Sequence, residues 1–150
     1  MNAVIAAARP PDELALERAF ERIRTERMVG LPFLNEQLRV EALGFRDWQG
    51  VRVGALVTPW AINLVILPAP GTTLPPARTG AARHWQFPSG AYPFDAHTEP
   101  SLGAYQQCSL ISPPEEFESH AAAVAAARAA LEALFAPPPG LSRRGLLLGS

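Results

Sequence analysis

Residues 38–68 read LRVEALGFRDWQGVRVGALVTPWAINLVILP, and this stretch decides the fold. Three short runs in it are rich in branched and aromatic side chains, and breaks at residues 48–50 and at Pro59 separate them, so they predict consecutive β-strands. Apolar residues alternate along the first two runs, which indicates one buried and one exposed face. The third run, residues 62–67, is almost continuously apolar and predicts burial on both faces or at an interface.

Further strands are predicted after this stretch. Residues 68–82 are dense in proline, glycine and threonine, and we interpret them as a surface loop that connects two halves of a sheet. Residues 83–97 predict a hairpin that turns at residues 88–90, and residues 102–112 predict one more strand. The sheet is therefore expected to be mostly antiparallel and to contain about five or six strands.

An amphipathic helix is predicted before the sheet, from about Pro11 to Met28. Apolar residues recur there at helical spacing, prolines supply the start, and a glycine follows the end. The outer side of this helix is expected to carry an acidic stripe, formed by Glu13, Glu17 and Glu21.

A second helix is predicted near the C-terminus. Ser112 is placed to cap it, Pro113 suits the first helical position, and Glu115 completes a serine-to-glutamate capping box. Apolar residues then continue at helical spacing to Phe135. The order of helix, strands and helix, without alternation, predicts the α+β class: a two-layer fold with a mostly antiparallel sheet and the N- and C-terminal helices packed on one face.

Length and composition predict a single domain over residues 1–150, since 48% of the residues are hydrophobic and 18% are charged. Residues 1–10 are expected to be a flexible N-terminus, residues 11–136 a globular core, and residues 137–150 a C-terminal tail. The net charge is −1, without a basic block, which argues against nucleic-acid binding and stable membrane insertion. The N-terminal apolar run is too short for a signal peptide, so a cytoplasmic location is expected.

Few residues suggest catalysis or metal binding. Cys108 is the single cysteine, which excludes an internal disulfide and a four-cysteine zinc site. A nucleophilic cysteine would need a base such as His84, His97 or His120, but no local motif supports one, and a lone strand cysteine is more often a small buried residue. No two of these side chains have the spacing of a ligand pair. We therefore expect no catalytic residue, no metal and no cofactor.

The break in the apolar stretch is the main candidate for a partner-binding surface. Pro59 and Trp60 interrupt a strand and place a large aromatic side chain beside a long apolar run. Two interpretations stay open: Trp60 fills the core at a bulge, or it lies on a surface that binds a partner, since tryptophan is enriched at both. Asn63 is expected to satisfy a backbone group at the break.

The chain ends in SRRGLLLGS, residues 142–150, which looks like a twin-arginine export signal at the wrong end of a protein. One interpretation is that Arg143 and Arg144 are solvated arginines on a terminus. The leucines at residues 146–148 favour another, since three exposed leucines would gain nothing on a free tail. On that interpretation the tail docks on the domain.

Several stretches together resemble one protein family. In order along residues 30–149 they are GLPFLNEQLRVEALGFRDWQG, VGALVTPWAINLVILP, FPSGAYPF, LGAYQQCSLISP and SRRGLLLG. In these blocks the sequence is similar to the HybE family of [NiFe]-hydrogenase assembly chaperones, which includes proteins named HupJ and HoxT. Ala61 and Pro114 depart from the residues common at their positions in that family.

The resemblance implies a cytoplasmic, non-enzymatic maturation chaperone. Such a protein holds a hydrogenase subunit while cofactors are installed, and it keeps the small subunit from leaving too soon through the twin-arginine pathway. The implied partners are the small-subunit precursor, the large subunit or both, and a homodimer is possible. The predicted partner-binding residues are Pro59, Trp60, Asn63, Tyr105, Cys108, Arg143 and Arg144.

Two questions stay open at this point. The tail either imitates the signal of the client and folds back onto the groove that receives it, or its arginines pair with the acidic stripe of the first helix. The function also has a rival, a redox or oxygen-protection factor that acts on the immature large subunit through Cys108. An enzyme with an unrecognised pocket is a further rival.

Overall fold

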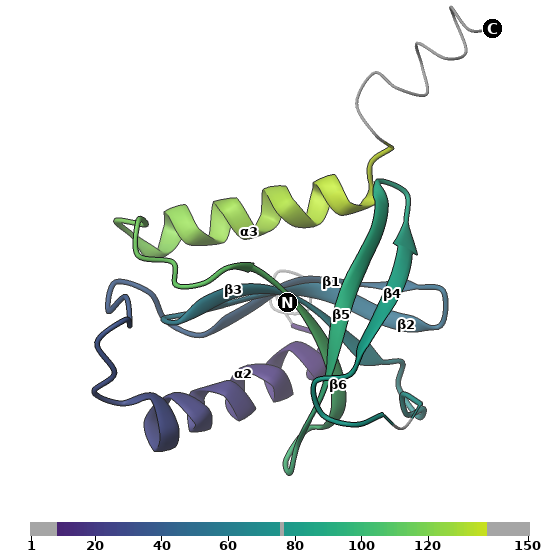
Figure 1. The fold of residues 1–150 in the computed structure, drawn as a ribbon, viewed down its shortest axis with the longest axis horizontal. Helices are drawn as coiled ribbons and strands as arrows, with labels where there is room; N and C mark the ends of the chain where they lie inside the picture. The colour runs from purple at the N-terminus through teal and green to yellow at the C-terminus, as the bar shows by residue number, and fades with distance from the viewer. Residues whose placement is uncertain (1–8, 76, 138–150) are drawn as a thin grey trace, which may run out of the picture.

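The computed structural model describes residues 9–75 and 77–137, which form one strongly twisted sheet with a helix on either side (Figure 1). Six strands follow one another in the order β1-β2-β3-β6-β5-β4, and all neighbouring strands are antiparallel. The predicted α+β class and the antiparallel sheet are confirmed. The elements are α2 (Pro11–Ile23), η1 (Arg24–Met28), β1 (Glu41–Trp48), β2 (Val51–Thr58), β3 (Ala61–Pro68), β4 (Ala82–Phe87), β5 (Gly90–Glu99), β6 (Gly103–Ile111) and α3 (His120–Phe135).

The first three strands form a meander joined by two-residue turns. Gln49 and Gly50 connect β1 to β2, and their φ angles of 45° and 85° are the positive values that a tight hairpin turn requires. Pro59 and Trp60 connect β2 to β3. β3 lies between β2 and β6, and residues 61–67 are all buried, so the predicted burial of this run on both faces is confirmed.

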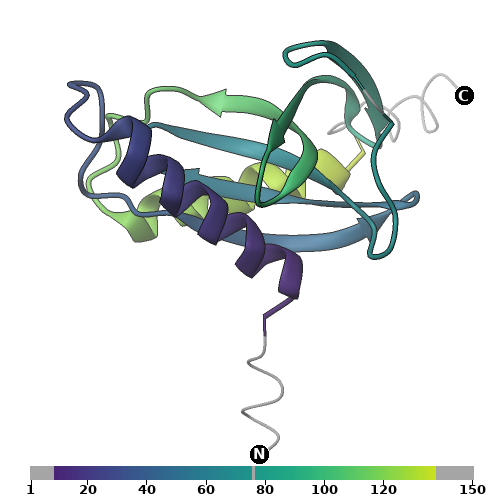
Figure 2. The same cartoon turned by 90° about the horizontal axis from the view of Figure 1, so that it is seen from below.

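The two helices cover opposite faces of the sheet (Figures 1 and 2). Along β2 the side chains alternate, so that Val53 and Val57 pack with α3 whereas Leu56 packs with α2. The prediction of two layers with both helices on one face is therefore wrong, and the fold has three layers. The physical reason is β3, which is apolar on both faces, so each face needs a helix to exclude water.

The first helix follows its predicted bounds, since α2 continues directly into the π-helical turn η1. Pro11 occupies the first turn, where its missing N–H costs no hydrogen bond. The apolar stripe faces the sheet, with Leu16, Ala19 and Phe20 at most 4% exposed.

Two members of the predicted acidic stripe, Glu13 and Glu17, do not lie on the outer side of this helix, whereas the Glu21 side chain is 47% exposed. Glu13 is only 6% exposed, and its carboxylate accepts a hydrogen bond of 3.0 Å from the backbone N–H of Phe45. Glu17 accepts one of 2.8 Å from the N–H of Ala42. The physical reason is that the outer edge of β1 carries unpaired donors, and a carboxylate beside each donor satisfies it.

The helix α3 begins later than predicted. Its cap is Ser119, whose hydroxyl accepts a hydrogen bond of 3.1 Å from the N–H of Ala122. The predicted cap at Ser112 and its capping box with Glu115 are wrong, because Pro113 would have to be helical directly before Pro114, and the residue before a proline is disfavoured in a helix. The Ser112 hydroxyl instead donates to the carbonyl of Trp60 at 3.4 Å.

The β4–β5 hairpin turns at Pro88 and Ser89, as predicted, and curls toward α3 (Figure 1). Pro93 has no N–H to donate, and β5 pairs with β6 only over residues 95–99, so this end of the hairpin is free to leave the sheet. The N–H and the hydroxyl of Ser89 both donate to the carbonyl of Leu134, at 3.3 and 2.9 Å. Aromatic rings fill the corner that results: Trp48, Phe87, Tyr92, Phe94 and Phe135.

Candidate functional site

The turn at Pro59 and Trp60 is held by hydrogen bonds from both of its flanks. The Thr58 hydroxyl donates to the carbonyl of Ala61 at 2.9 Å and accepts from the N–H of the same residue at 3.0 Å. The N–H of Asn35 donates to the carbonyl of Pro59 at 2.8 Å. Pro59 is buried and Trp60 is half-buried, so of the two predicted partner-binding residues Trp60 is the one that reaches solvent.

Three aromatic rings connect α2 to the sheet beside this turn. The ring of Phe20 stacks on Trp60 with centroids 6.3 Å apart, and it meets the ring of Tyr105 edge-on at 5.9 Å. The structure thus brings together two predicted partner-binding residues, Trp60 and Tyr105. Sequence analysis does not single out Phe20, because an aromatic residue on the apolar face of a helix has the pattern of any core residue.

A chain of polar side chains crosses the same side of the sheet. The Asn63 amide nitrogen donates to Gln107 Oε1 at 3.1 Å, and Gln107 Nε2 lies 3.4 Å from His97 Nε2. The His97 ring stacks on Tyr105, with centroids 5.6 Å apart. Asn63 is 5% exposed, and its Oδ1 has no hydrogen-bond partner among the described residues. Asn63 therefore contacts a side chain instead of the expected backbone group, and it leaves one acceptor unused.

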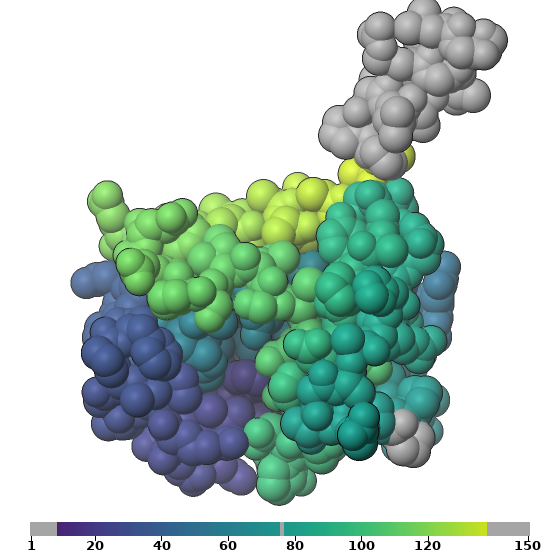
Figure 3. All heavy atoms as spheres, in the orientation of Figure 1, coloured from purple at the N-terminus to yellow at the C-terminus, as the bar shows by residue number. Residues whose placement is uncertain are grey.

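These side chains lie on the side of the sheet that α2 covers, and the surface of the molecule is hollowed on that side. Figure 3 shows the hollow between α2 and the segment after it on one side and the strands β5 and β6 on the other. We call this region the α2-side hollow and define it by a connected set of side chains: the partly exposed Trp60, His97 and Gln107 and the buried Phe20, Asn63 and Tyr105. Trp60, His97 and Gln107 are partly exposed and are therefore available to a partner.

Sequence analysis misses Gln107 and His97 as members of this site. Each lies on a predicted strand, and strand alternation from Tyr105 places Gln107 on the same face. The pairing of β5 with β6, which sets His97 opposite Tyr105, is the information that a single sequence does not provide.

Carboxylates lie beside the α2-side hollow on β5. Pairing with β6 places Asp95 and Glu99 on the same face as His97. Glu99 is 16% exposed and accepts two hydrogen bonds of 2.9 Å from Arg27, whereas Asp95 is exposed and forms no ion pair with any described residue. Burial raises the pKa of Tyr105 to about 12, with the charge of Glu99 adding to the shift and Arg27 opposing it.

Cys108 lies on the opposite face of the sheet. It packs against the core on the α3 side, and its partner across the strands is Leu64. Burial raises the pKa of its thiol, and the charge of Asp95 adds to the shift, so the thiolate that reacts with oxidants is disfavoured. The structure therefore separates Cys108 from Trp60, Asn63 and Tyr105, with which it was grouped as a partner-binding residue.

The contacts of His120 are structural, because they join α3 to the residues at the start of β1. His120 Nε2 lies 2.8 Å from a carboxylate oxygen of Glu41, and its Nδ1 accepts a hydrogen bond from the N–H of Arg39 at 3.2 Å. Within residues 9–75 and 77–137, no three His, Cys, Asp or Glu side chains are arranged to hold a metal ion. Among the helices described, none has the length and apolar character needed to cross a membrane.

The predicted site residues Arg143 and Arg144 lie outside the described residues, as do most of the predicted tail and residues 1–8. The glutamates of the first helix that were predicted as partners of these arginines already have other partners. Arg9 lies 2.7 Å from Glu17 and 3.2 Å from Glu13. Pairing of the tail with the acidic stripe would have to compete with these contacts.

Comparisons with known proteins relate this arrangement to hydrogenase assembly. The sequence profile of a family described as "[NiFe]-hydrogenase assembly, chaperone, HybE" matches residues 12–149. The solution structure of HybE from Escherichia coli aligns with a TM-score of 0.69 and 25% identity, over 87% of this chain and 82% of that one.

Individual relatives agree with the family match. The hydrogenase expression/formation protein HupT of Azotobacter chroococcum is 39% identical over 88% of this chain and 91% of its own length. HupJ of Bradyrhizobium diazoefficiens, a hydrogenase expression/formation protein, is 38% identical over 81% of this chain and 70% of its own. The probable rubredoxin HupJ of Rhodobacter capsulatus is 37% identical over 81% of this chain. The matched region is only 44% of the length of that protein.

These similarities define the class of the protein, an assembly chaperone of [NiFe]-hydrogenases. The chain belongs to the HybE family of such chaperones, whose profile it matches from Asp12 to Gly149. The resemblance predicted from the sequence blocks is thereby confirmed.

Proposed function

We propose that this chain holds a [NiFe]-hydrogenase subunit precursor in the α2-side hollow until cofactor insertion and subunit assembly are complete. The bound segment we infer is the twin-arginine signal of the small subunit, in preference to the face that this subunit offers to the large one. The observation that carries the proposal is the partly exposed ring of Trp60, which is connected through Phe20 and Tyr105 to the face of β5 that carries Asp95 and Glu99. A half-buried tryptophan in a concave site is a common anchor for a partner.

A twin-arginine signal combines two guanidinium groups with an apolar segment, and the hollow offers groups for both. The partly exposed ring of Trp60, supported by the buried rings of Phe20 and Tyr105, provides apolar surface, and guanidinium groups stack well on aromatic faces. Asp95 provides a carboxylate without an ion pair among the described residues.

Occupancy alone is sufficient for this role. A precursor whose signal is bound is withheld from the export machinery in proportion to the fraction bound, so no covalent step or nucleotide is required. We therefore propose a non-enzymatic chaperone that acts in the cytoplasm. Release follows when assembly of the client removes or weakens the contacts in the hollow.

The rival function, redox or oxygen protection of the immature large subunit through Cys108, has less support. Sensor cysteines are exposed and have a low thiol pKa, whereas Cys108 is half-buried and burial raises its pKa. We propose a packing role for this residue.

The test is capture of the small-subunit precursor by variants at Gln107, which is partly exposed in the hollow. Gln107→Arg introduces a cation, and we expect it to lower capture of the precursor by about tenfold or more, because like charges across an interface are costly. Gln107→Glu is similar in size and opposite in charge, and capture should be retained or increased. Precursor without its signal should bind weakly to every variant.

Two further variants complete the experiment. Trp60→Ala should weaken capture of the precursor, with thermal unfolding measured alongside, because Trp60 also stacks on Phe20. Cys108→Ser, on the opposite face, is the matched control and should leave capture within about twofold, as expected for a site outside the interface. Equal capture by the two Gln107 variants, or recovery of the large subunit alone, would contradict the proposal. Loss of maturation in Cys108→Ser with normal folding would favour the redox rival.

A further inference from the structure

One edge of the sheet is closed by side chains. At β1 the N–H groups of Ala42 and Phe45 donate to the carboxylates of Glu17 and Glu13, at 2.8 and 3.0 Å. The carbonyl of Ala42 accepts a hydrogen bond of 2.7 Å from Arg9. Backbone groups that another strand would need are thus already used, which protects this edge from strand addition.

The opposite edge, β4, has no such cover in the described part of the chain. β4 pairs only with β5, and the pair of Phe87 and Gly90 closes a two-residue turn. In such a hairpin every second residue of β4 hydrogen-bonds to β5, so the backbone groups of Ala82, His84 and Gln86 point to the open edge. Among the residues described, no backbone hydrogen bond reaches these groups from outside the hairpin. They are free to pair with a further strand.

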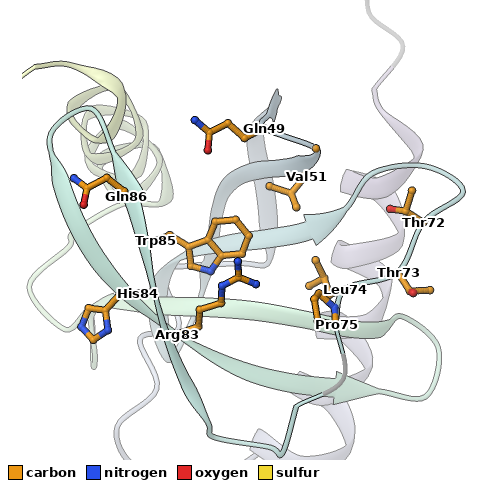
Figure 4. Close-up of a pocket in the computed structure, with 11 residues that line it drawn as sticks. Gln49, Val51, Thr72, Thr73, Leu74, Pro75, Arg83, His84, Trp85 and Gln86 are labelled. Carbon is orange, nitrogen blue, oxygen red and sulfur yellow. The ribbon is translucent and has the colours of Figure 1, made fainter.

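A pocket of about 470 Å³ runs along this open edge. Figure 4 shows that Arg83 and Trp85 point into it, whereas His84 and Gln86 point away from it. A strand added to β4 would place every second side chain on the Trp85 side, within the pocket. The remaining walls come from the β1–β2 turn and from the loop before β4, and consist of Gln49, Gly50, Val51, Thr72, Thr73, Leu74 and Pro75.

We propose that residues 141–148 of this chain add to β4 as a seventh strand, antiparallel to it, with leucine side chains in the pocket. The tail starts in the right place, because the Ser89 hydroxyl and N–H bind the carbonyl of Leu134 and so fix the end of α3 beside the turn that ends β4. A chain that continues from there and returns along β4 runs antiparallel to it.

The length and composition of the tail fit this edge. Extended chain advances about 3.3 Å per residue, so the six residues of β4 span about 20 Å and the 13 residues from 138 to 150 reach about 43 Å. Prolines at 137–139 have no N–H and precede the proposed pairing. Leu146 and Leu148 are two residues apart, so both side chains fall on one face of an extended strand. In the proposed pairing they enter the pocket and contact its apolar wall, which Val51 and Leu74 form.

The tail is favoured over a second copy or a client strand because it is tethered. A segment joined to its site by a short linker has an effective concentration in the millimolar range. A separate strand would have to be present at about that concentration to compete with it. The inference concerns the protein alone and stands apart from the client proposed above.

The experiment is nuclear magnetic resonance of the full chain without any client. We expect cross-strand contacts between β4 and residues 141–148, and an amide of His84 that exchanges with solvent at least about tenfold more slowly than in an unfolded chain. His84→Pro removes the outward N–H, since His84 lies opposite Pro93 and outside the β5 ladder, and should abolish the contacts of the tail. His84→Ala keeps the N–H and is the matched control.

A second variant leaves the folded domain untouched. Leu146→Asp combined with Leu148→Asp should return the exchange rate of the His84 amide to that of an exposed strand edge, with every β4–β5 contact intact. Free exchange at His84 in the unaltered protein would overturn the proposal, as would contacts of the tail with Trp60 instead of β4. Protection that rises with protein concentration would assign the edge to a second copy, and protection that appears only with a client would assign it to the client; either result overturns docking of the tail.

Discussion

Gly54 shapes the α2 side of the sheet by having no side chain. A Cβ built at this position would lie 2.2 Å from Cδ1 of Phe45, so the ring of Phe45 occupies the space directly over the glycine. The register explains why the ring is there: Leu43 pairs with Ala55 and Arg46 with Val53, so two residues of β1 oppose the single residue Gly54. This bulge depends on two strands together, and for that reason it was not predictable from the pattern of either strand.

We predict that Gly54→Ala destabilises the protein by about 1–3 kcal/mol, the range for an overpacked core. The measurement is urea unfolding, followed by circular dichroism. The double variant Gly54→Ala with Phe45→Leu should be less destabilised than the sum of the two single variants, because the smaller side chain relieves the clash. Strict additivity of the two changes would show that the clash is not the cause.

At the scale of elements, α2 contributes polar contacts as well as apolar ones. Sequence periodicity correctly predicts that Leu16 and Phe20 face the sheet, because that pattern is local to the helix. The same reasoning places Glu13 and Glu17 in solvent and is wrong, because the donors that they satisfy belong to another element, β1. Charged residues lie inward where they complete the hydrogen bonds of a strand edge.

We predict that Glu17→Ala destabilises the protein by about 1–3 kcal/mol, because the N–H of Ala42 loses its acceptor in a half-buried place. Glu17→Gln keeps an oxygen acceptor and should cost less. The exposed residue Glu26 provides the control, since Glu26→Ala should change stability by no more than about 0.5 kcal/mol. Urea unfolding of the three variants measures the differences, and equal effects of alanine at positions 17 and 26 would contradict the assigned contact.

At the scale of the whole molecule, the number of layers is what sequence analysis misjudges. Turn residues and strand periodicity are local signals, so the strands and the hairpin at Pro88 and Ser89 were predictable. The apolar run at residues 62–67 also predicts burial on both faces, a conclusion that already conflicts with helices on one face. Packing resolves this conflict, because a strand that is apolar on both faces is stable only when another element shields each face from water.

The candidate site was likewise predictable only where the signal in the sequence is local. Trp60 and Tyr105 are recognisable as partner-binding candidates from the sequence, but their joint contact with Phe20 depends on where α2 crosses the sheet. Cys108 is separated from them because it follows Tyr105 by three residues on one strand, and an odd separation places side chains on opposite faces. The alternation of side chains along a strand is a local pattern, so the sequence alone is sufficient to separate Cys108 from Tyr105.

Tyr105 links the stability of the whole domain to alkaline pH. Burial raises its pKa from 10.0 to about 12, so the folded state favours the neutral phenol. The stabilisation that depends on this proton is therefore complete below pH 10 and is lost as the pH rises from 10 toward 12. A shift of this size corresponds to about 2.7 kcal/mol over that window, reduced where water reaches the hydroxyl.

We predict that the free energy of unfolding of the unaltered protein falls more steeply between pH 9.5 and about 11.5 than that of Tyr105→Phe, which has no proton to lose. Urea unfolding of both proteins at several pH values gives the two slopes. Every other titrating group is common to both proteins and cancels in the difference, so the difference isolates this phenol. Parallel slopes would mean that Tyr105 ionises without leaving its place between Phe20 and His97, and that the hollow admits water in the free protein.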